Sequence, residues 1–135
     1  MSEILVLRLV HVLGGIFWVG SAVFSGVFLL PALAAAGPAA GQVMGGMRRR
    51  HLFTVLPVVA TLTTLSGLRL MWLTSGGFSA AYFASPGGAT FAASGAAAIA
   101  AFVLTLLVGR PANARAMALG ARIEAADEGS RAALL

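Results

Sequence analysis

Long runs of apolar residues, separated by short polar or glycine-rich segments, dominate the pattern of this sequence. Three runs, at about 4–33, 52–73 and 90–108, contain few charged residues and no Asp or Glu. A helix needs about 20 apolar residues to cross a bilayer, and each run meets this length. The pattern therefore predicts an all-α integral membrane protein, with an antiparallel bundle of three transmembrane helices in residues 1–109.

The composition agrees with a membrane protein, because 59% of the residues are hydrophobic and only 10% are charged. Soluble domains carry about 25% charged residues. The absence of Cys excludes disulfides, thiolate metal ligands and cysteine nucleophiles. The basic residues lie near the ends of the apolar runs and form no stripe beside stacking aromatics, which argues against nucleic-acid binding. The predicted partner is the lipid bilayer.

The distribution of Arg predicts the orientation of the spans. The linker 34–50 ends in Arg48, Arg49 and Arg50, whereas the linker 74–89 carries no charge. Cytoplasmic segments are enriched in Arg and Lys, so the first linker is expected on the cytoplasmic side and the N-terminus on the periplasmic side. The residues 110–135 hold four more Arg and are expected to form an amphipathic cytoplasmic tail. The absence of Lys beside abundant Ala, Gly and Arg is typical of a bacterial protein, which favours the cytoplasmic (inner) membrane.

A histidine interrupts the first apolar run. At 100° per residue, one face of this helix carries His11, Gly15, Trp18, Ala22 and Leu29, and Arg8 lies within about 60° of that face. An ionisable residue inside a membrane is costly, and it normally faces protein. The small residues on the same face allow a neighbouring helix to approach closely.

The depth of each polar residue limits which of them can act together. His11 lies about 30 Å along the helix from the cytoplasmic end of the first span, whereas His51 begins the second span on the cytoplasmic side. The two histidines of one chain therefore cannot share a metal ion. Arg69 and Met71 are expected at the periplasmic level of His11 and Arg8. We expect these four residues to form a cluster near Trp18 and Trp72.

Three interpretations fit this predicted cluster. In the first interpretation, His11 is an axial ligand of haem b, and the opposite ligand is Met71 or His11 of a second copy. Arg8 and Arg69 then bind the haem propionates. In the second, His11 and Met71 bind copper, because Cu(I) accepts imidazole and thioether ligands. In the third, His11 bonds to a Ser or a backbone carbonyl and only fixes the packing, and the chain is a cofactor-free structural or assembly subunit.

Two motifs resemble those of small multi-span proteins of the CopD-type and HemJ-type superfamily. The first is His11-x6-Trp18-x-Gly20 followed by Leu29-Leu30-Pro31, and the second is Met47-Arg48-Arg49-Arg50 followed by Pro57, Thr61 and Gly67-Leu68. The resemblance covers about residues 8–73 and some of its motifs are short. It implies that His11 is a haem b ligand, as in HemJ-type protoporphyrinogen oxidases, or a copper-handling residue, as in CopD-type proteins.

Two features differ from the family pattern. The third predicted span has no His or Lys, which HemJ-type proteins carry there, so protoporphyrinogen oxidation is not carried over to this chain. The family also implies a fourth span. The Ala-, Gly- and Ser-rich third helix favours self-association or docking to a partner subunit in the membrane.

Overall fold

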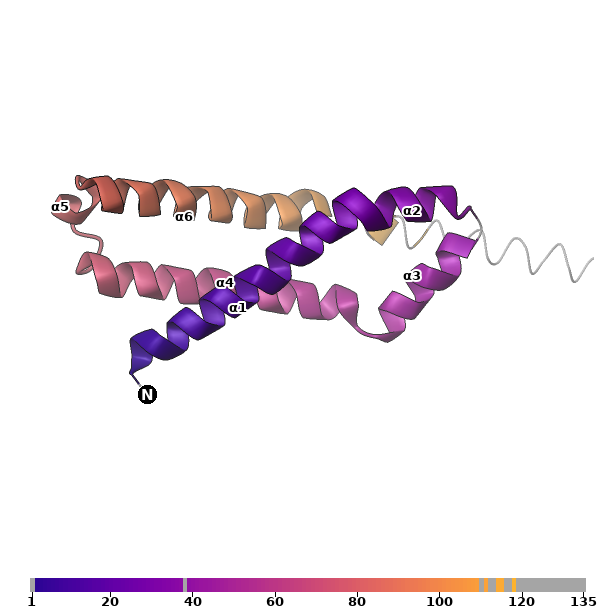
Figure 1. Cartoon of the computed structure of the whole chain (residues 1–135), viewed down its shortest axis with the longest axis horizontal. Helices are drawn as coiled ribbons and strands as arrows, with labels where there is room; N and C mark the ends of the chain where they lie inside the picture. Colours follow the sequence, from indigo (N-terminus) through magenta and orange to yellow (C-terminus); the bar gives the residue numbers. More distant parts are fainter. Residues whose placement is uncertain (1, 38, 110, 112–113, 116–117, 119–135) are drawn as a thin grey trace, which may run out of the picture. The chain divides into compact units, whose positions relative to one another are not determined.

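The computed structural model describes residues 2–37, 39–109, 111, 114, 115 and 118. Regular structure in this part of the chain is entirely helical, and Figure 1 shows the helices in order. Three helical stretches are long and apolar enough to cross a membrane, namely Glu3–Ala35, Leu52–Ser75 and Pro86–Gly109. The predicted all-α class and the three candidate spans are thereby confirmed for the described residues. The tail predicted over 110–135 lies almost wholly outside them.

The first candidate span contains a change of helical pitch. Helix α1 (Glu3–Phe24) passes into a π-helical turn, η1 (Ser25–Leu29), and then into α2 (Leu30–Ala35). The amide of Leu30 donates to the carbonyl of Ser25, five residues back. Pro31 has no amide hydrogen to donate to the preceding turn, and a single π turn keeps the helix continuous at such a place.

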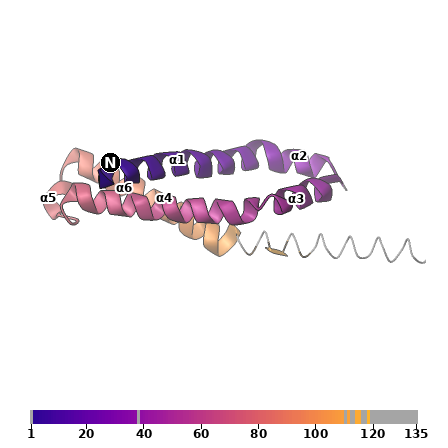
Figure 2. The same ribbon diagram turned by 90° about the horizontal axis from the view of Figure 1, so that it is seen from below.

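A helix occupies much of what the sequence suggested was a linker. Gly37 reverses the chain with a φ of 54°, and α3 (Ala39–Arg49) follows despite its three glycines. Helices α2 and α3 contact each other, and α3 also contacts α4 (Leu52–Ser75), as Figure 2 shows. His51 joins α3 to α4 in the left-handed conformation, with a φ of 57°.

Serine residues shape the connection after α4. Short α5 (Ala80–Phe83) precedes α6 (Pro86–Leu104), which continues into a second π turn, η2 (Thr105–Gly109). The hydroxyl oxygen of Ser85 accepts from the amide of Gly88 at 3.1 Å, and Pro86 occupies the first turn. This N-terminal capping starts the third helix four residues before the predicted Thr90, because Ser and Pro favour these positions.

The chain divides into residues 1–99 and 100–135, and the first unit contains the contact between α1 and α4. The two helices are antiparallel, since Glu3 at the start of α1 pairs with Arg69 near the end of α4. Further along the same two helices, Gly14 of α1 lies against Val59 and Thr63 of α4. A Cβ atom on Gly14 would collide with the Thr63 hydroxyl. The glycine therefore sets how closely the helices approach.

Most hydroxyl groups in the helices are satisfied within their own helix. Six of them donate to the carbonyl four residues back, and the pairs are Thr61 to Pro57, Thr64 to Ala60, Thr74 to Leu70, Thr90 to Pro86, Ser94 to Thr90 and Thr105 to Ala101. A bilayer interior offers no water, so such internal bonds let polar side chains face lipid at low cost.

Replacement of Gly14 tests the close approach of α1 and α4. We expect Gly14→Ala to destabilise the protein by about 1–3 kcal/mol, the usual cost of overpacking, because Thr63 is β-branched and stiff. Gly20→Ala is the matched control, since its Cβ would meet nothing within 4 Å. Thermal unfolding in detergent, followed by circular dichroism, measures both.

Adding Thr63→Ala to Gly14→Ala should recover part of the loss, because the colliding hydroxyl is then gone. Equal unfolding temperatures for Gly14→Ala and Gly20→Ala would contradict this account of the seam between α1 and α4.

Candidate functional site

The imidazole of His11 lies half-buried between α1 and α4. Its Nδ1 atom is 2.8 Å from the backbone carbonyl oxygen of Thr63. A carbonyl oxygen can only accept, so Nδ1 carries the hydrogen and donates it. In the neutral ring Nε2 then has the free lone pair, which is the arrangement commonly found for metal-binding histidines.

Gly67 provides the space for the imidazole ring. A Cβ atom built on Gly67 would lie 2.6 Å from Cε1 and 2.9 Å from Nδ1 of His11. Any larger residue at this position would push the ring away from α4. In the sequence, Gly67 stood out only as part of a Gly-Leu motif. Its role as the seat of His11, meaning the position on α4 against which the imidazole packs, could be recognised only once the register of α1 against α4 was known.

Thr63 and its neighbours make this seam polar. Thr63 is 5% exposed and Ser66 is also 5% exposed, and the hydroxyl of Ser66 donates to the Thr63 carbonyl oxygen at 3.0 Å. The Thr63 hydroxyl oxygen is the one buried side-chain polar atom without a hydrogen-bond partner in the described part of the chain. It faces Gly14 instead, where a weak C–H···O contact can form.

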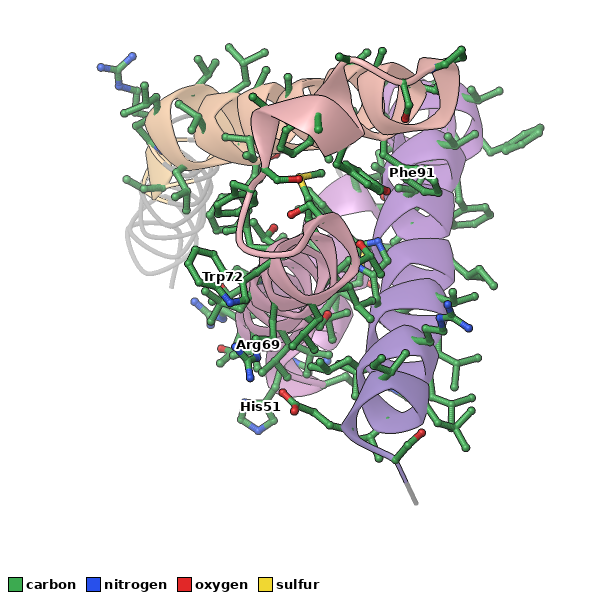
Figure 3. The ribbon with its side chains drawn as sticks, turned by 90° about the vertical axis from the view of Figure 1, so that its left-hand side faces the viewer. His51, Arg69, Trp72 and Phe91 are labelled. Carbon is green, nitrogen blue, oxygen red and sulfur yellow. The ribbon has the colours of Figure 1, made fainter. Side chains whose placement is uncertain are left out.

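Arg69, predicted to lie near His11, has a carboxylate partner. Its Nε atom donates to Glu3 Oε1 at 2.8 Å, and the two side chains are 48% and 55% exposed. Figure 3 shows Arg69 and Trp72 on the same side of α4. Arg8 is exposed on α1. The sequence did not indicate Glu3 as the partner, because the two residues lie at opposite ends of their own helices and meet only where α1 and α4 pack antiparallel.

Met71 and Trp18 are both half-buried, in different surroundings. A Cβ atom on Gly95 would lie 2.8 Å from Cε of Met71, so the methionine packs on α6 within the first unit. Trp18 lies on α1 two turns after His11, on the same half-buried face. Met71 follows Gly67, the seat of the imidazole, by one turn of α4.

His51 lies far from His11. It is exposed at the start of α4, and 16 residues of helix, about 24 Å, separate it from Gly67. Among the described residues no group of three or more His, Asp or Glu is placed to hold a metal ion. The site around His11 thus offers one imidazole, fixed by a carbonyl, with a thioether nearby along α4.

A double-mutant cycle tests the link between Glu3 and Arg69. We expect Glu3→Gln and Arg69→Gln to be coupled by about 0.2–1 kcal/mol in the free energy of unfolding, because both groups are half exposed and screened by solvent. The coupling should decrease at high salt. Thermal unfolding of the single and double variants measures it.

Arg8→Gln is the control, because this substitution also removes one positive charge and Arg8 lies at the end of α1 that carries Glu3. Additive effects of the Glu3 and Arg69 substitutions would show that the pair contributes nothing to holding α1 on α4.

No protein-family model, no curated protein and no solved structure matches this chain. The resemblance to CopD-type and HemJ-type proteins therefore depends on the motifs of the sequence alone.

Proposed function

We propose that this chain is a membrane-embedded helical subunit that binds haem b through Nε2 of His11. The bond from His11 Nδ1 to the Thr63 carbonyl supports this proposal, because it fixes the tautomer and the orientation of the ring. A bound haem b would supply one-electron redox chemistry. The chain itself supplies the imidazole, its orientation and an apolar surrounding.

The residues present fit a haem that would be held by one histidine of this chain. Gly67 leaves room for the imidazole, and Trp18 offers an aromatic surface on the same face of α1. Arg8 is exposed and free to approach a propionate, whereas Arg69 would have to leave Glu3. A second ligand would come from Met71, which lies against Gly95 of α6, or from a residue outside this chain.

A second copy of the chain is the simplest source of that ligand. Helix α1 has no buried residue and is among the most apolar parts of the described structure. A surface hollow of about 240 Å³ on α4 is lined by Pro57, Val58, Thr61 and Leu62. His11 does not line it, so this hollow is not the proposed cofactor site. We therefore propose a homo-oligomer, in which His11 of another copy would be the second ligand, or a complex with another membrane subunit that would supply it.

Copper is the other cofactor that the donor set allows. One imidazole and one thioether match Cu(I), which prefers soft ligands. His11 and Met71 belong to different helices of the first unit and would supply two ligands, and a partner would supply the rest.

The same geometry favours a second function, in which His11 acts as a clamp between helices and binds no cofactor. The observation in its favour is that the imidazole already bonds to α4 through Nδ1 and fills the space above Gly67. The chain would then be a structural or assembly subunit. Hydrogen bonds between membrane helices contribute about 0.6 kcal/mol on average.

The absorption spectrum of the detergent-purified protein, oxidised and then reduced, distinguishes these functions. We expect a Soret band, either as purified or after haem is added, and its loss in His11→Ala because the axial ligand is gone. His51→Ala is the matched control and should keep the band. Metal analysis of the same samples tests for copper.

If His11 only clamps the two helices together, the same proteins should give different results. A wild-type protein that stays colourless with added haem would overturn haem binding, and a lower unfolding temperature of His11→Ala in that protein would support the clamp. His11→Gln retains a side-chain donor and should then recover part of the stability.

A further inference from the structure

Three consecutive arginines form a strongly basic cluster at the end of α3. Arg48, Arg49 and Arg50 are all exposed, and the exposed His51 follows them. The sequence contains no Asp or Glu between Glu3 and Glu124. The ion pair that the described residues do form, Glu3 with Arg69, lies at the opposite end of α4. Within the described part of the chain the cluster therefore has positive charge without a carboxylate partner.

Helix α3 presents this cluster on an amphipathic element. Its half-buried residues include Ala40, Met44 and Met47, which recur at helical spacing, whereas the arginines are exposed. The helix contacts α2 and α4, so it is held beside the start of the second candidate span. Short helices that combine half-buried apolar residues with exposed basic residues are typical of the membrane–water interface.

The turn at His51 fixes the cluster next to the apolar part of α4. His51 has a φ of 57°, and its carbonyl oxygen accepts from the amides of Thr54 and Val55 at 2.9 Å each. Apolar α4 begins at the next residue, Leu52. In a bilayer this connection would place the guanidinium groups at the depth of the lipid headgroups.

We propose that Arg48, Arg49 and Arg50 form a binding site for the phosphate groups of anionic phospholipids. This inference rests on the insertion of the chain into a bilayer, which is part of the proposed function, and is independent of haem. Guanidinium groups donate in pairs to phosphate oxygens. Each basic residue beside an anionic membrane surface strengthens association about fivefold, so three give about a hundredfold.

A fluorescent reporter beside the cluster tests the proposal. The full chain with Phe53→Trp, in a Trp18→Phe/Trp72→Phe background, is reconstituted into vesicles of phosphatidylcholine. Brominated phosphatidylglycerol or brominated phosphatidylcholine is then added as a minor component, and each quenches a Trp that it contacts. We expect stronger quenching by phosphatidylglycerol, and a smaller difference at high salt.

Two triple variants separate charge from structure. Arg48→Gln/Arg49→Gln/Arg50→Gln should lose the preference for phosphatidylglycerol, a decrease of up to about a hundredfold in relative association. Arg48→Lys/Arg49→Lys/Arg50→Lys keeps the charge and should keep most of the preference. Retention of the preference in the Gln variant would assign it to another part of the chain and overturn the site.

Equal quenching by the two lipids in the chain that keeps Arg48, Arg49 and Arg50 would also overturn the site. The chain would still be inserted in that case. Absence of quenching by either lipid would instead refute insertion of this part of the chain and the membrane function with it. The two failures are therefore distinguishable, and neither depends on the spectrum of bound haem.

Discussion

The hydrogen bond from the His11 imidazole to the Thr63 carbonyl is the interaction on which the seam between α1 and α4 depends. A histidine in an apolar helix is tolerated where its N–H finds an acceptor, and the Thr63 carbonyl provides one. This bond requires the helices to approach closely, which Gly14 and Gly67 allow because a side chain at either position would collide with α4 or with the imidazole. The packing and the position of His11 are thus two aspects of one constraint.

A single hydrogen bond also connects the two proposed roles of His11. Donation from Nδ1 holds α1 against α4, and it leaves the lone pair of the neutral ring on Nε2. A clamp and a ligand are therefore compatible in one residue. A substitution that disturbs the seam, such as one at Gly67, would displace the ring and so alter any ligand bound to it.

The apolar runs were enough to predict the class of the fold and the three candidate spans, because length and hydropathy are properties of single segments. The start of α6 was misplaced, since capping by Ser85 outweighed the two glycines that follow Pro86. Helix α3 was missed because its three glycines are typical of a linker, whereas its contacts with α2 and α4 hold it helical.

The candidate site was predictable only in part. The pattern identified His11 and the face on which it lies, because helical periodicity is local. The Thr63 carbonyl, the seat at Gly67 and the pairing of Glu3 with Arg69 depend on the register of two antiparallel helices. A backbone carbonyl that accepts a hydrogen bond has no signature in the sequence. The position of Arg69 along its helix could be inferred from the sequence, but its pairing with Glu3 could not.

The π turn at Ser25–Leu29 has a consequence for the connection between α1 and α4. Such a turn holds one residue more than an α-helical turn, and each residue corresponds to about 100° of rotation. Loss of one residue there would rotate α2 around the axis of α1 without moving His11, whereas Arg48, Arg49 and Arg50 would stay beside the start of α4, because α3 contacts α4. The length of this short segment therefore sets, separately from the seam, which face of α2 meets α3.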